Sequence, residues 1–201
     1  MEKINYQKKM EDILNKLEGV PKLLLHSCCA PCSSYVLTYL TKYFDITVLY
    51  YNPNIEPIEE YEKRKQEEIR FIKEMDKVNK IDLLDCDWEH DKFIEMARGL
   101  EEEPERGKRC YKCYELRLRK TCEVAKEHNY DYFASTLTLS PYKNSDWVNE
   151  IGYNLEKEFN IKYLCSDFKK NDGYKKSIEL SKEYNLYRQN YCGCIYSKPK
   201  E

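Results

Sequence analysis

The sequence lacks long hydrophobic runs. No stretch approaches the ~18 consecutive apolar residues that a membrane-spanning helix requires. The first twenty residues are charged throughout and contain no apolar segment of the kind found in secretory signals. These absences exclude a membrane protein and argue against secretion, so we expect a cytoplasmic protein.

Glycine and proline are scarce, with 6 and 7 residues among 201, which argues against disorder and low complexity. The chain has no G-x-G-x-x-G fingerprint, no Walker sequence and no other glycine-rich phosphate loop. We therefore expect neither ATP nor a dinucleotide as a cofactor. The formal net charge of −2 argues against polyanion binding through the overall charge, although such a sum can hide a local basic patch.

Cysteine, in contrast, is abundant, with ten residues. A chain of 201 residues buries enough surface to fold without disulfides or metals, and we expect one domain over residues 1–201. The cysteines therefore need another explanation. In a reducing compartment, clustered cysteines bind metal or carry out redox chemistry more often than they form structural disulfides.

Short apolar runs alternate along the chain with segments of helical spacing. This alternation predicts βα crossovers and a mostly parallel sheet, which is an α/β, three-layer Rossmann-like fold with about five strands. We expect a leading helix within residues 1–20 and a helical, cysteine-bearing C-terminal segment over residues 173–201. The expected strands cover residues 23–25, 46–51, 81–86, 132–138 and 161–165, and the main helices between them cover 59–77, 88–98, 109–127 and 146–159.

Two cysteine groups lie far apart in the sequence. Cys28, Cys29 and Cys32 share the turn after the first strand, and Cys110 and Cys113 form a C-x-x-C motif about eighty residues later. Thiolates are soft ligands, so two such groups brought together could hold an iron-sulfur cluster or a tetrahedral metal. The alternative is a structural zinc site, although adjacent cysteines count against regular zinc spacing.

Five thiols are one more than a four-cysteine site uses. The surplus thiol is either a small buried residue or a ligand of a second metal, iron or zinc, next to the first. Cys32, one turn into its helix, is the candidate for the structural role. Asp85 and Asp87, at the end of the third strand, are the carboxylates that could reach a metal or donate a proton.

Cys192 and Cys194 flank a single glycine near the end of the chain. Such a spacing permits a small, strained disulfide, and strained disulfides have oxidising potentials that suit a redox-active pair. The alternative is two further metal ligands. For the other three cysteines, which are Cys86, Cys122 and Cys165, burial as small hydrophobic residues is the favoured interpretation.

A basic patch lies beside the C-x-x-C motif. Residues 108–120 contain six basic side chains against one acidic side chain, and the C-terminal half adds lysines interleaved with tyrosines. This combination is typical of surfaces that bind phosphates and stack on unpaired bases, whereas the alternative is solvated helix faces and core aromatics. The candidate substrate-binding residues are Arg109, Lys112, Arg117, Tyr142, Lys143 and Arg188.

Four motifs, taken together, carry a resemblance to a known family. They are residues 26–33 (His-Ser-Cys-Cys-Ala-Pro-Cys-Ser), residues 109–113 (Arg-Cys-Tyr-Lys-Cys) followed by Arg117-Leu118, residues 136–144 (Thr-Leu-Thr-Leu-Ser-Pro-Tyr-Lys-Asn) and residues 187–194 (Tyr-Arg-Gln-Asn-Tyr-Cys-Gly-Cys). In combination they resemble the QueH family of epoxyqueuosine reductases, over about residues 22–197. These are tRNA-modifying oxidoreductases that work without cobalamin.

The resemblance implies a nucleotide α-hydrolase-like fold and reduction of epoxyqueuosine to queuosine in tRNA, the last step of queuosine formation. It also implies that Cys28, Cys29, Cys110 and Cys113 bind a 4Fe-4S cluster and that Cys192 and Cys194 form a redox-active disulfide. The expected partners are tRNA carrying epoxyqueuosine and an electron donor that the sequence does not identify.

The reaction removes an oxygen from an epoxide and therefore needs two electrons and two protons. A cluster transfers one electron at a time, so a second metal, the thiol pair or two sequential reductions must supply the rest. We expect a cluster iron, or an adjacent metal held by the surplus cysteine and an aspartate, to act as the Lewis acid. The rival functions are a zinc-stapled tRNA-binding module without catalysis and a thiol-disulfide oxidoreductase.

Overall fold

The computed structural model describes residues 4–198, so the outer ends of the expected leading helix and C-terminal segment, residues 1–3 and 199–201, lie outside the described residues. Five parallel strands form one sheet in the order β3-β2-β1-β4-β5. This is the order of a doubly wound sheet, and the expected three-layer fold class is confirmed. The strands are β1 (Lys22–His26), β2 (Asp45–Tyr50), β3 (Ile81–Asp85), β4 (Tyr132–Ser135) and β5 (Lys162–Tyr163).

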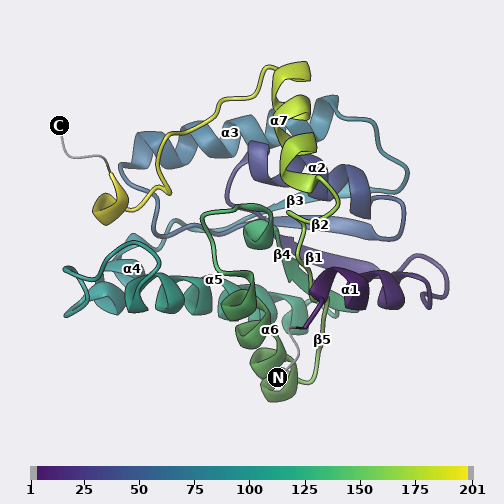
Figure 1. Cartoon of the computed structure of the whole chain (residues 1–201), viewed down its shortest axis with the longest axis horizontal. Coiled ribbons are helices and arrows are strands. Elements are labelled where there is room, and N and C mark those ends of the chain that lie inside the picture. The colour runs from purple at the N-terminus through teal and green to yellow at the C-terminus, as the bar shows by residue number, and fades with distance from the viewer. Residues whose placement is uncertain (1–3, 199–201) are drawn as a thin grey trace.

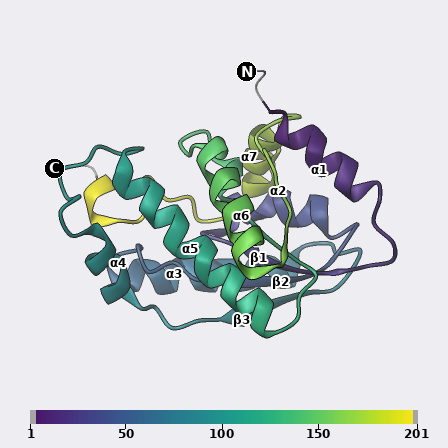
Figure 2. The same ribbon diagram turned by 90° about the horizontal axis from the view of Figure 1, so that it is seen from below.

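Helices cover both faces of the sheet. Figure 1 shows α2, α3 and α7 on one side of it and α5 and α6 on the other, and Figure 2 gives the second view of this arrangement. The helices are α1 (Tyr6–Leu14), α2 (Ala30–Leu40), α3 (Ile58–Glu74), α4 (His90–Ala97), α5 (Lys108–Glu127), α6 (Ser145–Phe159) and α7 (Gly173–Glu183), with 3-10 helices η1 (Thr136–Leu139) and η2 (Ile195–Ser197). No helix in residues 4–198 is long and apolar enough to cross a membrane.

The alternation of side chains along the strands builds two cores. Leu23 and Leu25 pack with Phe71 on the side of α2 and α3, whereas Leu24 packs with Leu118 on the side of α5 and α6. Successive residues of a strand point to opposite faces, so a continuous apolar run is what a sheet covered on both faces requires. This burial fixes the register of β1 and therefore the place of the turn that follows it.

Two strands are shorter than expected. The fourth ends at Ser135, because the Ser135 hydroxyl accepts a hydrogen bond from the Leu137 amide at 3.2 Å and caps the 3-10 helix η1. The fifth contains only Lys162 and Tyr163, and it pairs with β4 alone at the edge of the sheet. Apolar composition predicted both runs correctly as buried segments but did not mark where the strand pairing stops.

Candidate metal centre and active site

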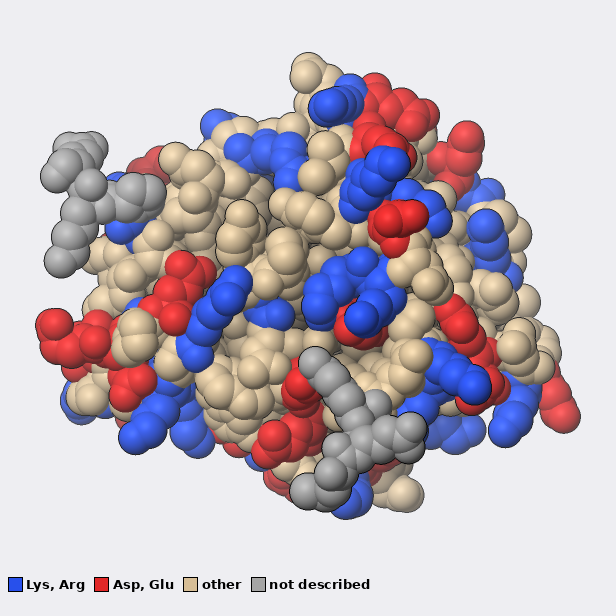
Figure 3. Space-filling view, in the orientation of Figure 1, with Lys and Arg blue, Asp and Glu red and all other residues tan. Residues whose placement is uncertain are grey.

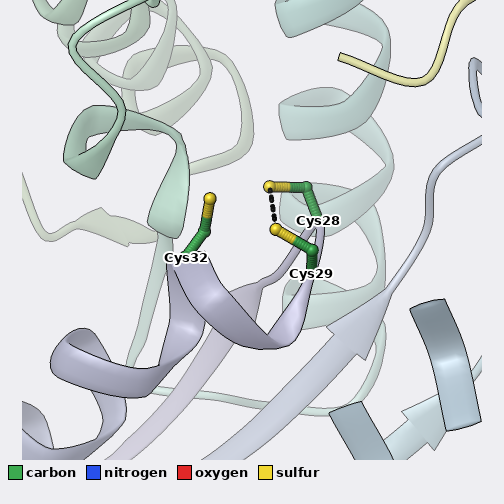
Figure 4. Close-up of side chains that lie close together, drawn as sticks. All are labelled: Cys28, Cys29 and Cys32. Carbon is green, nitrogen blue, oxygen red and sulfur yellow. Dashed lines mark hydrogen bonds between the residues drawn. The ribbon is translucent and has the colours of Figure 1, made fainter. Parts of the chain in front are cut away.

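The turn between β1 and α2 carries three cysteines whose sulfur atoms lie within 4.8 Å of one another. Figure 4 shows these side chains side by side at the start of the helix. The Sγ atoms of Cys28 and Cys29 are 3.8 Å apart, and the Cys32 amide donates to the Cys29 carbonyl at 3.0 Å. Pro31 lies in the first helical turn, where its missing N–H group costs nothing. Three convergent thiols could hold a metal ion.

Cys110 lies in the first turn of α5 and Cys113 in the second, so the second cysteine group is at the start of this helix as expected. Cys110 packs against the same core cluster as Cys28 and Cys29. Cys113 is buried in a small cluster with Cys194. The fold therefore brings cysteines from the turn after β1, the start of α5 and the C-terminal segment toward the carboxyl end of the central strand.

The C-terminal segment completes this arrangement. Cys192 lines a cavity of about 360 Å³ together with Cys28 and Cys32. The side-chain amide of Gln189 donates to the Cys29 sulfur at 3.0 Å. Cys192 and Cys194 are free thiols, and no disulfide is present among the described residues.

The same cavity is lined by three of the predicted substrate-binding residues, Tyr142, Lys143 and Arg188. Tyr142 is exposed, and the Arg188 guanidinium donates to the Ser181 hydroxyl at 3.0 Å. Figure 3 shows Lys and Arg side chains near the centre of the face that Figure 1 presents, with Asp and Glu side chains among them. This face is therefore mixed in charge, and the cavity itself is lined by the cations Lys143 and Arg188 together with Glu105.

The electrostatics of the turn favour a single thiolate. Hydrogen bonds from the Cys29 and Cys32 thiols lower the pKa of Cys28 well below its usual value, and the charges of Lys143 and Arg117 lower it further. The hydrogen bond to Cys28 conversely raises the pKa of Cys29 to about 12. Negative charge therefore resides first on Cys28, which lines the cavity.

Arg117 is a buried cation beside the thiols rather than a surface residue. Its side chain is 1% exposed, its Nε donates to the Cys113 carbonyl at 3.2 Å, and one terminal nitrogen has no partner within residues 4–198. Burial alone would lower the pKa of Arg117, but the neighbouring Cys113, Cys192 and Cys28 raise it above its usual value. A permanent cation at this place compensates anionic sulfur and does not line the cavity.

Two other predicted substrate-binding residues lie elsewhere. The guanidinium of Arg109, 2% exposed, donates to the carbonyls of Leu100, Glu101 and Glu103 at 2.6–3.0 Å and so holds the acidic loop. Lys112 is exposed and pairs with Glu115 at 2.9 Å. Neither residue lines the cavity. The prediction failed for them because a count of charges in the sequence does not reveal which face of α5 is buried.

Asp85 and Asp87 also differ from the expectation. They line a second cavity of about 530 Å³, which has no lining residue in common with the first, and Asp85 pairs with Lys65 at 2.8 Å. Within residues 4–198, the only group of three potential ligands with mutually close donor atoms consists of Cys28, Cys29 and Cys32. The structure therefore does not place these aspartates with the surplus cysteine. Asp85 ends β3 and Asp87 follows it, but β2 lies between β3 and β1, which the cysteine turn follows.

Cys122, Cys165 and His26 are core residues, as expected. Cys122 and Cys165 are fully buried, whereas Cys86, for which burial was also expected, is half-buried in the wall of the second cavity. His26 is a core residue whose ring nitrogens contact the Ser135 hydroxyl at 2.9 Å and the Tyr51 carbonyl at 3.0 Å.

Sequence reasoning missed Arg64, Glu68 and Gln189. Arg64 and Glu68 are buried on α3, where Tyr61 and Phe71 complete a face with helical spacing. The signal was present, because this spacing places both charged residues on the apolar side of the helix. No local pattern indicated that Gln189 contacts the cysteine turn.

The chain forms an α/β protein with a parallel sheet between two helix layers. Its buried thiols, which could hold a metal ion, lie beside a cavity at the carboxyl ends of the strands, where sheets of this kind place their functional sites. A sequence profile described as "Epoxyqueuosine reductase QueH" matches residues 23–200. The chain belongs to this enzyme family, and the resemblance noted from the motifs is confirmed.

Relatives from several bacteria match over most of the chain. A protein of Staphylococcus epidermidis named epoxyqueuosine reductase QueH is 45% identical over 100% of this chain and 87% of its own length. Its namesake in Streptococcus pyogenes is 46% identical over 98% of this chain and 79% of its own length. That of Thermotoga maritima is 34% identical, with 87% of this chain and 89% of the relative covered.

Among solved structures, a "predicted subunit of tRNA methyltransferase" from Methanocaldococcus jannaschii shares 16% identity with this chain. Its TM-score is 0.48, with 80% of this chain and 74% of that chain covered. A likeness at this level carries no argument about the site.

Proposed function

We propose that this protein reduces epoxyqueuosine to queuosine in tRNA, at the 360 Å³ cavity beside the cysteine turn. One observation carries the proposal: Cys28, Cys192 and Lys143 line the same cavity. Thiols that can hold a redox centre therefore share one chamber with a cation. Family membership supplies the substrate, and the abundant free thiols suit a cytoplasmic location.

Cys28, Cys29, Cys110 and Cys113 are the residues that would hold a 4Fe-4S cluster. The donor set fits such a group, because four thiolates are its usual ligands, and three of these side chains share one packed cluster. The buried guanidinium of Arg117 supplies positive charge for a centre with anionic ligands. When bound, the cluster would supply electrons one at a time.

Cys192 and Cys194 supply the second reducing group. Oxidation of their two thiols to one disulfide releases two electrons and two protons. Conversion of the epoxide to an alkene consumes two electrons and two protons, and the oxygen leaves as water. The dithiol thus balances one turnover, and an external donor of two electrons must then reduce the disulfide.

Lys143 is the cation we assign to the departing oxygen. Burial alone would lower its pKa, but the nearby thiols of Cys192, Cys28 and Cys32 raise it, so the amine stays protonated. An ammonium group in the cavity wall can donate a hydrogen bond to the epoxide oxygen as negative charge develops there. Arg188 and Tyr142, at the same cavity, are placed to contact phosphate and to stack on a base.

Cys32 is the residue that would bind a second metal next to the cluster. Its sulfur belongs to the three-thiol group, but Asp85 and Asp87 line the other cavity, so a second metal would take its remaining ligands from water or substrate. Metal analysis for iron and zinc, together with Mössbauer spectra of anaerobically purified protein, tests this proposal. Only cubane iron, without a further ferrous or zinc site, would contradict it.

The function is tested by anaerobic incubation of the metal-loaded protein with a chemical reductant and epoxyqueuosine-bearing tRNA, followed by nucleoside analysis. We expect queuosine to form. A Cys192→Ser, Cys194→Ser double variant should lose at least about a hundredfold in turnover, and Cys86→Ser, in the wall of the other cavity, serves as the matched control.

The same experiment separates the rival functions. Protein that binds the tRNA and contains only zinc, yet forms no queuosine, would indicate a non-catalytic tRNA-binding module. Reduction of model disulfides without conversion of the tRNA would indicate a thiol-disulfide oxidoreductase. Full turnover by the double variant would remove the thiol pair from the reaction.

A further inference from the structure

The segment that carries Cys192 and Cys194 runs from α7 along α3 toward α4 and α5, as Figures 1 and 2 show. It contains no helix or strand between residue 183 and η2, so contacts with its neighbours must hold it in place. Its upstream part is tied to α3 by the Arg70 guanidinium, which donates to the Tyr184 carbonyl at 3.0 Å. The part that bears the cysteines needs an anchor of its own.

Arg64 is that anchor. Its side chain is 1% exposed, and its Nη1 donates to the Cys192 carbonyl at 3.1 Å. Its Nε donates to Glu60, one helical turn earlier, at 2.7 Å, and the guanidinium lies over the Tyr191 ring at 5.1 Å. Its other terminal nitrogen has no partner within the part of the chain that the structure describes.

Gly193 shows how closely this part of the segment is fitted. Its φ is +119°, in the region that favours glycine, and a Cβ atom there would lie 2.8 Å from the Ile55 side chain and 3.1 Å from Arg64. The Gly193 carbonyl accepts from the Glu56 amide at 2.9 Å, and the Tyr191 hydroxyl donates to the Glu56 carbonyl at 2.7 Å. Contacts on both sides of Cys192, one from a side chain and one from the backbone, therefore depend on one docking geometry.

We propose that Arg64 is a positioning residue that fixes Cys192 against the cysteine turn by holding its carbonyl from α3. The proposal rests on the proposed function of Cys192 and assigns Arg64 no contact with the substrate. Arginine suits the place because two nitrogens of its planar fork reach a carboxylate and a carbonyl that lie apart, whereas the three donors of lysine share one nitrogen. The desolvated guanidinium can make both bonds only while the segment is docked.

The test compares wild-type protein with Arg64→Lys and Arg64→Met variants, all anaerobic and metal-loaded, without tRNA. The first readout is the rate at which iodoacetamide alkylates Cys192, resolved by peptide mass spectrometry. The second is the glutathione ratio at which Cys192 and Cys194 are half-oxidised. Arg70→Met is the matched control, because Arg70 ties the same segment to the same helix away from the cysteines.

We expect Arg64→Met to raise the alkylation rate of Cys192 about tenfold, because that factor corresponds to the loss of one hydrogen bond to a charged group. The glutathione ratio at which Cys192 and Cys194 are half-oxidised should shift as well. Arg64→Lys should recover part of the change. If the methionine variant does not fold, the lysine variant at unchanged melting temperature decides. Wild-type values for both variants, or an equal change in Arg70→Met, would overturn the proposal. Failure of wild-type protein to convert tRNA would overturn only the proposed function, since neither readout uses tRNA.

Discussion

At the scale of single residues, Glu68 is the buried group with the clearest consequence for stability. It is fully buried on α3, where one carboxylate oxygen accepts from the Ser33 hydroxyl at 2.9 Å and the other has no partner within residues 4–198. Burial raises the pKa of Glu68 from 4.5 to about 8, although the hydrogen bond from the Ser33 hydroxyl partly offsets the shift. The carboxyl is therefore protonated in the folded protein at neutral pH.

The stability of the protein should consequently fall as the pH rises from about 4.5 to about 8. In this range the folded state keeps a proton that the unfolded state has released, which costs up to ~1.4 kcal/mol per pH unit. Glu68→Gln keeps a hydrogen-bond acceptor but cannot ionise, so its stability relative to wild type should increase with pH. Urea unfolding at pH 5 and pH 8.5 measures the effect, and parallel stability curves for the two proteins would contradict it.

At the scale of elements, α6 and β5 meet across a glycine. A Cβ atom at Gly152 would lie 2.3 Å from ring carbons of Tyr163, whose side chain is buried between the helix and the sheet. Gly152→Ala should destabilise the protein by about 1–3 kcal/mol through overpacking, although alanine favours the helix itself. Asn154→Ala, at an exposed position of the same helix, is the control. Equal melting temperatures of the two variants would show that α6 can shift to accommodate the methyl group.

The elements also show what the sequence could predict. Apolar runs such as Leu23–Leu25 and the helical spacing after Pro31 were enough to predict the succession of strands and helices along the chain. These patterns follow from burial of the sheet on both faces. They did not mark the end of β4, where the Ser135 hydroxyl competes with strand pairing by capping η1. Hydrogen bonds of this kind involve one side chain and leave no periodic signal.

The site was predictable to a similar degree. The cysteine motifs identified residues that lie near the carboxyl ends of the strands. Parallel strands all end on the same side of the sheet, and this holds whatever the sequence of the connecting loops. The substrate assignments failed to separate Lys143, at the cavity, from Arg109, which holds three carbonyls of the acidic loop. Arg109 directly precedes Cys110 in the sequence and Lys143 is distant from every cysteine, so only the packed structure shows that Lys143 is the one that faces the cavity.

At the scale of the whole molecule, binding of tRNA must depend on local charge, because the chain is nearly neutral. The affinity should therefore fall steeply with salt, with a slope of about −0.7 to −0.9 per phosphate contacted. Lys143→Met and Arg188→Met should each weaken binding and reduce that slope by about one. Lys112→Met, on the exposed face of α5, is the control, and filter binding at graded potassium chloride measures all four proteins. Equal slopes for every variant would place the tRNA on another surface.

We propose, as the central claim, that Cys28 and Cys29 of the cysteine turn and Cys110 and Cys113 at the start of α5 together bind one metal centre beside Cys192. Iron and sulfide analysis with Mössbauer spectroscopy on anaerobically purified protein tests it most directly, applied to wild type, Cys28→Ser, Cys110→Ser and the core control Cys122→Ser. We predict cubane spectra from about four irons per chain in the wild type and the control, beside the signal of the second metal proposed at Cys32, and loss of the cubane signal in the other two variants. Zinc in place of iron, or full cluster content in Cys28→Ser and Cys110→Ser, would contradict the claim.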